Sequence, residues 1–382
     1  SGVSQYIIRR LLLMIPTLLG VSLLVTAFVR LLPGDAVDIL TANNEIQGRD
    51  EILKVAVAEE LVKEGKDPLT AAFVDRKRIE DRFVDDQLRR DGLNPATATP
   101  AERNSALNTF ALNAYKDEIR GRLGLDKNYV EQWLSWTGNA LRGDLGVTLA
   151  GGRPIGPELR DRLPTSLELG VLGMAISIVI ALPIGVISAV KQDSAIDYVA
   201  RSSAIGMLAL PSFFLATIII ALASRWFNYS CPFFFEKLWD DPAANLKLVW
   251  VPGVILGIGL SGTIMRLTRG QMLEVLRQDY MRTARSKGLA ESTTVIRHGV
   301  RNAFIPIITI IGLQIPVLVG GSLVLEQIFG IPGVARYLFT AINNRDFPVI
   351  IAVNMLFAVV IIFANLVVDL TYAVLDPRIR LS

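Results

Sequence analysis

The sequence predicts an all-α membrane protein with six transmembrane helices and a helical extracytoplasmic insertion. Of its 382 residues, 51% are hydrophobic and 20% are charged, and the mean hydropathy is +0.43. This composition is too apolar for an ordinary soluble chain. Six charge-free runs approach or exceed the roughly 18 to 20 residues that cross ~30 Å of hydrocarbon. The runs are Leu11–Val29, Leu169–Val190, Ser202–Ser224, Leu248–Met265, Asn302–Leu325 and Phe347–Val368.

The first run is interpreted as a membrane span rather than a cleaved signal peptide. Arg9 and Arg10 precede its apolar core, as basic residues do in a secretory signal. The core is nevertheless longer than the roughly 7 to 15 residues of such a signal, and no small-x-small cleavage site follows Leu32. Residues 1–35 are therefore predicted to be an N-terminal segment that includes the first transmembrane helix.

Basic residues in the segments between the runs predict which side of the membrane each segment faces. If the N-terminus lies inside, then residues 191–201, residues 266–301 and the tail from Asp369 also lie inside. These segments hold most of the Lys and Arg of the short loops. Short basic loops stay cytoplasmic, so both termini are predicted to be cytoplasmic.

Residues 36–164 are then one long extracytoplasmic region with a helical insertion. Thr99-Pro100-Ala101-Glu102 combines an N-cap, a proline at the first helical position and a capping-box glutamate, and predicts a helix that runs to about Leu123. Two earlier helices are predicted at Glu51–Lys63 and Leu69–Arg90. The second places the sequence DRKRIED on one side and four apolar residues on the other: Phe73, Phe83, Val84 and Leu88. We interpret the insertion as a small cap over the outer mouth.

Aromatic residues gather at two places outside the runs. Trp133 and Trp136 lie on an expected amphipathic helix, where a position at the membrane interface and packing under the cap explain them equally well. The outer loop 225–247 is also rich in aromatic side chains. An interfacial belt is favoured there over a binding surface.

A polar passage from Arg277 to Pro306 separates two apolar runs. It carries seven basic residues, His298 included, against two acidic ones. Residues 280–286 contain no helix breaker and are followed by Gly288, which predicts a short helix ended by a glycine in the left-handed conformation. A second helical segment is predicted from about Glu291 through Arg301. The basic excess predicts that the passage is cytoplasmic.

Residues for catalysis, metal binding or energy conversion are scarce in the sequence. Cys231 is the sole cysteine and His298 the sole histidine, so no disulfide or Cys/His metal site is expected. No phosphate-binding loop motif occurs, and a net charge of +3 gives no support to nucleic-acid binding. The ionisable residues of the spans sit at span ends, which argues against ion coupling: Arg30, Glu168, Glu326 and Asp369.

Neutral polar residues within the spans are the candidates for lining a pathway. They are Ser212, Thr217, Gln314 and Asn354. Hydrogen bonding between helices is the alternative role for each of them.

The polar passage resembles the cytoplasmic loop of the membrane subunits of bacterial ATP-binding-cassette importers, in the dipeptide, oligopeptide and nickel permease branch. The family's Glu-Ala-Ala, three residues and Gly fall on Arg282-Thr283-Ala284 and Gly288, and its Ile-x-Leu-Pro falls on residues 298–301, so the general pattern's Glu and Pro are absent. The sequences of residues 320–348 and 365–380 resemble the same branch almost word for word. The resemblance covers the first span and nearly everything from Gly124 onward, and leaves out residues 36–121.

This resemblance implies a permease with the type I importer fold in the bacterial cytoplasmic (inner) membrane. It implies a second homologous permease subunit, two ATP-binding subunits and an extracytoplasmic solute-binding protein as partners, beside the lipid bilayer, with no nucleic acid and no cofactor bound by this chain. The implied substrates are peptides. The residues implied to couple the chain to its ATPases are Arg282, Thr283, Ala284, Arg285, Lys287, Gly288, His298 and Arg301.

The expected organisation is therefore a first helix in residues 1–35, an extracytoplasmic region at 36–164, and a core permease domain at 165–382 with five transmembrane helices and a coupling loop at 277–303. The alternative is a passive channel or a membrane scaffold without ATP coupling. An enzyme is not expected, because no acid–base pair or metal cluster lies within the spans.

Overall fold

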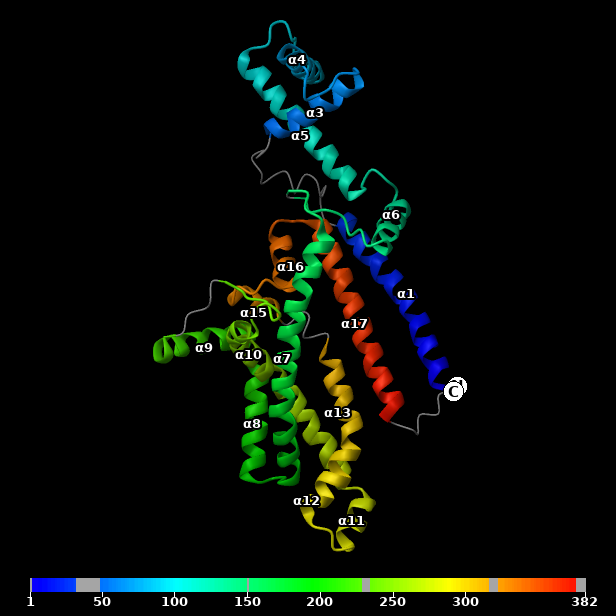
Figure 1. Cartoon of the computed structure of the whole chain (residues 1–382), viewed down its shortest axis with the longest axis vertical. Helices are drawn as coiled ribbons and strands as arrows, with labels where there is room; N and C mark the ends of the chain where they lie inside the picture. Colours follow the sequence, from blue (N-terminus) through cyan, green and yellow to red (C-terminus); the bar gives the residue numbers. More distant parts are fainter. Residues whose placement is uncertain (1, 32–48, 150, 229–233, 316–321, 376–382) are drawn as a thin grey trace. The chain divides into compact units, whose positions relative to one another are not determined.

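The computed structural model describes residues 2–31, 49–149, 151–228, 234–315 and 322–375 (Figure 1). Within these ranges the regular secondary structure is helical, with one isolated β-bridge between Val147 and Pro154. The chain divides into two compact units. One contains residues 1–22 and 144–382, and the other contains residues 23–143. The all-α prediction is confirmed.

Several helices are long and apolar enough to cross a membrane. Among the described residues these are α7 (Ile155–Val190), α10 (Pro242–Leu276) and the segment Phe347–Val368 of α17 (Phe347–Leu375). A fourth candidate is a bent pair, and α1 (Gly2–Leu31) contains a shorter apolar stretch at Leu12–Ala27. The predicted run at 302–325 begins in α13 (Arg301–Leu313) but lies partly outside the described residues. The protein is thus a multi-pass membrane protein.

The bent pair shows that the predicted run at Ser202–Ser224 is not one straight helix. The structure ends α8 (Ala195–Ala209) and begins α9 (Ser212–Phe227) with an angle of 101° between them. Pro211 explains the break, because it has no backbone N–H to donate and it disfavours a helical conformation at the preceding residue. Leu210 is accordingly extended.

Helices α7 and α10 lie side by side and pack closely through glycines. A Cβ atom added at Gly257 of α10 would lie 2.9 Å from the Gly173 carbonyl oxygen of α7 and 2.7 Å from Cγ2 of Ile176. A Cβ atom at Gly253 would lie 2.6 Å from Leu172. Small residues let two backbones approach in this way within a membrane. The α7–α10 pair is therefore the centre of the core, with Ile255 and Ile264 fully buried in it.

A buried carboxylate ties the ends of three helices together. Asp197 of α8 accepts hydrogen bonds from the Ser188 hydroxyl of α7 and from Nε and Nη2 of Arg269 of α10, the latter two both at 2.7 Å. The Asp193 amide donates to the same carboxylate at 3.0 Å. Because the charge is both paired and saturated with donors, the cost of burying it is offset. The turn between α7 and α8 is thereby held against α10.

A second buried carboxylate, Glu326 of α15 (Leu323–Ile328), organises the other end of the core. It accepts from the Ser166 hydroxyl of α7 at 2.7 Å and from the Arg336 amide at 2.8 Å, in the first turn of α16 (Val334–Asn343). A Cβ atom at Gly333 would lie 2.3 Å from this carboxylate, so a larger residue there would force the Glu326 side chain to move. The carboxylate also complements the amide groups of the helix N-terminus.

The second unit is built from short helices, among them α3 (Arg49–Lys63), α4 (Phe73–Arg90), α5 (Pro100–Leu123) and α6 (Tyr129–Leu141). The predicted capping box at Thr99 and Glu102 is present, and α5 ends at Gly124 with a left-handed conformation. Phe83 of α4 stacks on Phe110 of α5 with 4.4 Å between ring centroids. Sequence periodicity and capping therefore account for these helices.

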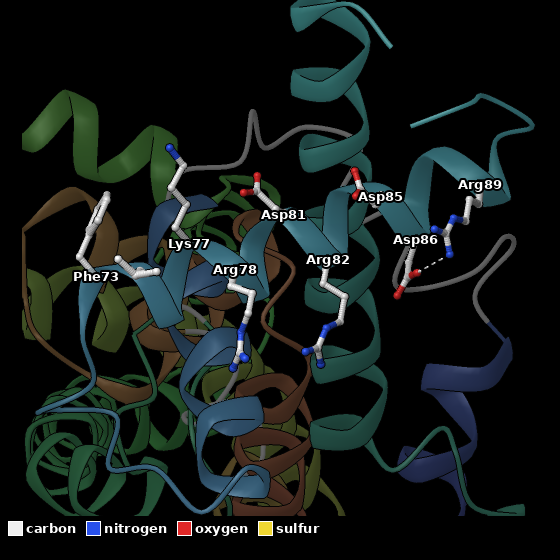
Figure 2. Close-up of a pocket in the computed structure, with 9 residues that line it drawn as sticks. Phe73, Lys77, Arg78, Asp81, Arg82, Asp85, Asp86 and Arg89 are labelled. Atoms are coloured by element: carbon white, nitrogen blue, oxygen red, sulfur yellow. Dashed lines mark ion pairs between the residues drawn. The ribbon is translucent and has the colours of Figure 1, made fainter. Parts of the chain in front are cut away.

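The exposed face of α4 borders a hollow of about 530 Å³ and carries charges of both signs (Figure 2). Lys77, Asp81 and Asp85 follow one edge of the helix, and Arg78 and Arg82 follow the other. Such a mixture gives the hollow no strong field of one sign. The face has the character of a solvated helix surface rather than of an ion-binding site.

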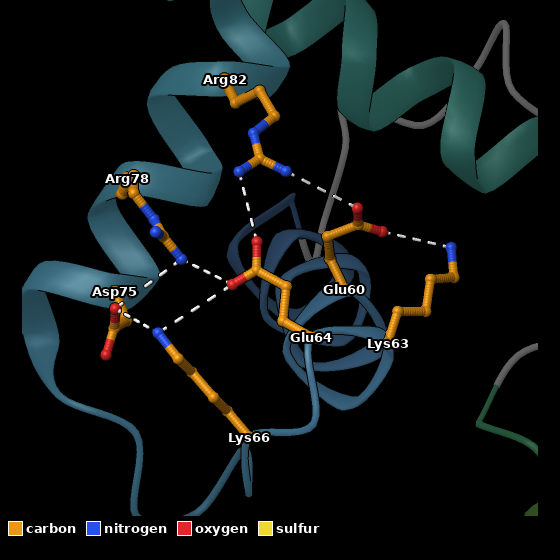
Figure 3. Close-up of polar contacts among 7 residues, drawn as sticks. All are labelled: Glu60, Lys63, Glu64, Lys66, Asp75, Arg78 and Arg82. Carbon is orange, nitrogen blue, oxygen red and sulfur yellow. Dashed lines mark hydrogen bonds and ion pairs between the residues drawn. The ribbon is translucent and has the colours of Figure 1, made fainter.

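Ion pairs join α3 to α4 (Figure 3). In the turn that follows α3, Glu64 pairs with Arg82 of α4 at 3.2 Å, and Lys66 pairs with Asp75 of α4 at 2.6 Å. Arg78 also contacts Glu64. Each pair is at least partly exposed to solvent and would contribute little alone, but several charges held in one network fix the geometry of the two helices more firmly.

The structure corrects the predicted apolar face of α4. Phe83, Val84 and Leu88 face the core as predicted, but the side chain of Phe73 is 77% exposed. Ile79, inside the polar sequence DRKRIED, is fully buried with Val57 and Leu61 of α3. The helical period explains the burial of Ile79, because position 79 shares a face with position 83. Position 73 lies on the same side by this period, but it is the first residue of α4 and its side chain is exposed there.

Replacing Ile79 with alanine is expected to destabilise the α3–α4 pair by about 2–5 kcal/mol, the usual cost of truncating a buried isoleucine. Hydrogen exchange on the intact chain would show faster exchange of α3 and α4 amides. Phe73→Ala serves as the matched control on the same helix and should leave the exchange unchanged. Equal effects of the two substitutions would contradict this assignment of the buried face.

Candidate coupling loop and translocation pathway

The loop after α10 begins with a short helix, α11 (Asp279–Ser286), as the sequence predicts. Two of its residues, Met281 and Ala284, are buried, while the remaining side chains are exposed. They are three positions apart and so lie on one face of the helix. Through this apolar face α11 packs against the rest of the loop, and the opposite, largely basic face is left exposed.

Gly288 makes the turn that follows α11. Its φ is +77°, a left-handed conformation that favours glycine, and its amide donates to the Arg285 carbonyl. No heavy atom lies within 4 Å of the position that a Cβ atom would take. The predicted glycine turn is therefore confirmed, and the constraint on this residue comes from its backbone conformation and not from crowding.

A bidentate ion pair closes the turn. Arg285 of α11 donates to both carboxylate oxygens of Glu291, at 3.0 Å and 2.8 Å. These hydrogen bonds lower the pKa of Glu291 below its usual value. A lowered carboxyl pKa means that the pair contributes above the pKa of the unfolded state and is lost as the pH falls. At neutral pH the loop is therefore closed by an ionised pair.

The chain after the turn differs from the predicted helix at Glu291–Arg301. A single α-helical turn, α12 (Glu291–Thr293), passes into a π-helix, η1 (Thr294–Val300), before α13 begins. The wider π turn presents Gly299 to α10 and α11, where its Cβ position lies 3.4 Å from Met272 Cε and 3.6 Å from Met281 Cε. The loop is thus packed against α10 through methionines, whose flexible side chains fill irregular gaps.

The residues predicted to couple the chain to its ATPases occupy different environments. Ala284 is buried and His298 is half-buried, with its carbonyl accepting from the Asn302 side chain at 2.7 Å. The others are exposed on the surface of the loop: Arg282, Thr283, Arg285, Lys287, Gly288 and Arg301. Six of the eight predicted coupling residues therefore form a basic, exposed surface on one loop, while the other two are buried or half-buried.

The four candidate pathway residues differ in hydrogen bonding and in exposure. Thr217 donates to the Phe213 carbonyl at 2.8 Å, and Asn354 donates to the Ile350 carbonyl at 2.8 Å, each within its own helix. Both side chains are exposed, whereas Ser212 and Gln314 are half-buried at the ends of α9 and α13. Their role in a pathway remains a prediction.

Comparison with known proteins identifies the family. Residues 181–381 match the binding-protein-dependent transport system inner membrane component family. The chain is also 31% identical over 401 aligned positions to the dipeptide transport system permease protein DppB of Escherichia coli (strain K12), with 98% of each chain covered. The chain belongs to this family. As an inner membrane component it is a permease subunit of an ATP-driven importer, not an enzyme, and separate subunits hydrolyse the ATP.

Further relatives agree with this assignment to the binding-protein-dependent transport family. The oligopeptide transport system permease protein AppB of Bacillus subtilis (strain 168) is 32% identical, with 99% of both chains covered. The glutathione transport system permease protein GsiC of Pectobacterium atrosepticum is 32% identical, covering 98% of this chain and 99% of the relative. The resemblance that the coupling loop and the C-terminal half predict is confirmed.

Sequence reasoning missed several residues that hold this permease together. Met281 seats the loop, and its three-residue spacing from Ala284 was a usable signal for that role. Asp197 and Arg269 are separated by 72 positions, so no local pattern pairs them. Glu326 was noticed only as a charge at a span end, while the structure buries it as the cap of α16.

Proposed function

We propose that this permease forms half of the translocation pathway for peptides delivered by an extracytoplasmic solute-binding protein. The relatives named for dipeptide, oligopeptide and glutathione transport support peptides as the substrate class. In the proposed complex a second homologous permease supplies the other half of the pathway, and two ATP-binding subunits dock on the cytoplasmic side. Both termini of the chain are cytoplasmic in this arrangement, and the chain binds no cofactor of its own.

The observation that carries the coupling proposal is the seating of α11 between α10 and η1. Met281 is fully buried, and its Cε atom lies beside Gly299, as does the Cε atom of Met272 of α10. A force applied to the exposed face of α11 is therefore transmitted to both α10 and α13. In the proposed mechanism, ATP binding closes the ATPase subunits, the loop follows them, and the pathway changes its opening from one side of the membrane to the other.

The composition of the complex is tested by native mass spectrometry of the chain extracted gently from its own membrane. A complex with one second permease and two ATP-binding subunits is expected. Recovery of the chain alone, or only as copies of itself, would overturn the importer assembly and favour a passive channel or a scaffold. Binding of a peptide-loaded solute-binding protein to the recovered complex then tests the substrate class.

The helical insertion is proposed to contact the delivering protein or to gate the outer mouth. Deletion of residues 43–121 removes α3, α4 and most of α5, and it is expected to reduce uptake several-fold while the loop at 277–303 and its ATPase partners are retained. Uptake into proteoliposomes, with co-purification of the ATPase subunits as the control for assembly, measures the effect. Uptake equal to that of the intact chain would rule out both roles.

A further inference from the structure

Three arginines line one cavity between α8 and α10. The cavity has a volume of about 330 Å³, and its walls include Arg201 and Ile205 of α8, Met265, Arg266 and Arg269 of α10, and Ser188 of α7. It lies beside the turn between α7 and α8, which the Asp197 network ties to α10. A volume of this size is at the lower end of the range for small-molecule sites, about 300–1,000 Å³.

The three guanidinium groups differ in their existing partners. Arg269 is neutralised by its bidentate pair with Asp197. Arg201 lies 5.7 Å from the ring centroid of Tyr198, and in the part of the chain that the structure describes no carboxylate forms an ion pair with it. Among the described residues, none forms a hydrogen bond or ion pair with Arg266, and the side chain is exposed. Two positive charges therefore remain in the cavity without a counter-charge, a situation that favours an anionic ligand.

The surface beside the arginines is apolar. Ile205 and Leu208 follow Arg201 by one and two helical turns on the same face of α8, and their side chains are 64% and 41% exposed. Arg201 lies only six positions beyond the start of α8 at Ala195, about 9 Å along the helix at 1.5 Å per residue. Charge thus lies near the membrane surface at which α7 ends, and exposed apolar side chains lie deeper.

We propose that this cavity binds the phosphodiester headgroup of an anionic phospholipid. Arg201 and Arg266 contact the phosphate oxygens, for which guanidinium groups have matching geometry, and an acyl chain follows Ile205 and Leu208. Basic pockets between transmembrane helices on the cytoplasmic side are suited to such headgroups. In the topology proposed above, the lipid belongs to the cytoplasmic leaflet. The ligand would brace α8 against α10 next to the buried Asp197–Arg269 pair.

The test is lipid retention by the assembled transporter. The complex is stripped of lipid, returned to mixed micelles of phosphatidylcholine and phosphatidylglycerol, and examined by native mass spectrometry. The wild type is expected to retain phosphatidylglycerol selectively. In the Arg201→Gln/Arg266→Gln variant its retention should fall about 30-fold, the equivalent of about 1 kcal/mol for each of the two arginines. Undiminished selective retention by this variant would overturn the proposal.

A matched control removes the same charge elsewhere. Lys191 follows α7 and Lys247 lies on α10, both exposed and neither in the wall of the cavity. The Lys191→Gln/Lys247→Gln variant should retain phosphatidylglycerol as the wild type does. An equal loss in the control would mean that only general membrane electrostatics is at work. Displacement of the lipid from the wild type by inorganic phosphate would instead assign the site to a free anion.

A second measurement uses only the wild-type transporter, so it tests the proposal even if the double variant fails to assemble. A photoactivatable phosphatidylglycerol analogue is added to the wild-type transporter, and its attachment sites are mapped by peptide mass spectrometry. Labels are expected to concentrate in residues 198–208 and 265–270. Labelling spread evenly over the exposed apolar helices, or absent from these two segments because a partner subunit covers them, would contradict the proposal.

Discussion

Replacing Gly288 with tryptophan is expected to abolish uptake while the chain still folds and inserts. The open space around the residue allows the new side chain to project into solvent, so the fold itself is not crowded. A non-glycine residue at φ +77° costs about 1–2 kcal/mol, an amount that a local turn can relieve by changing its conformation. The bulky ring then stands where, in the proposed complex, an ATPase subunit approaches α11. ATP-dependent uptake and the amount of inserted chain are measured together.

The matched variant at this position is Gly288→Asn. Asparagine adopts the left-handed conformation more readily than other residues with a side chain, and its small side chain leaves the loop surface nearly unchanged. It should therefore keep most of the uptake. If the tryptophan variant transported as well as the wild type, the loop would have no coupling role. If both variants lost uptake equally, strain in the turn rather than contact with a partner would be responsible.

The local features of the fold follow from short sequence patterns. The capping box at Thr99 and the glycine turns at Gly124 and Gly288 were all predictable, because each depends on a few neighbouring residues with distinct backbone preferences. Hydropathy likewise located the apolar helices. The bend at Pro211 carried a sequence signal, but the apolar run continued through it and concealed the change of direction.

The features that the sequence did not predict depend on contacts between distant segments. The π-helical turns around Gly299 reflect the packing of Met272 and Met281, which a local pattern does not reveal. Ile79 was hidden in a charged stretch, and only the presence of α3 shows that its face is buried. For the candidate coupling loop, the sequence located the basic exposed residues, whereas the buried contacts of Met272 and Met281 with Gly299 emerged from the structure.

Replacing Gly257 with valine is expected to prevent recovery of a stable transporter. The first added atom would lie 2.7 Å from Ile176 and 2.9 Å from the backbone oxygen of Gly173, so α7 and α10 must separate. Overpacking a core commonly costs about 1–3 kcal/mol, and separating these two helices would also disturb the core packed around Ile255. The yield of assembled complex in mild detergent, and its thermal unfolding, measure the loss.

Gly259 provides the matched control two residues away on the same helix. Nothing lies within 4 Å of its Cβ position, so Gly259→Val should assemble normally although it makes the same chemical change. Replacing Ile176 with alanine should rescue Gly257→Val only in part. The clash with the Gly173 carbonyl would remain, because this oxygen belongs to the backbone and no side-chain substitution removes it. Full rescue by Ile176→Ala would assign the constraint to side-chain volume. Partial rescue would show that the backbones of α7 and α10 must approach closely, which only glycine at 257 allows.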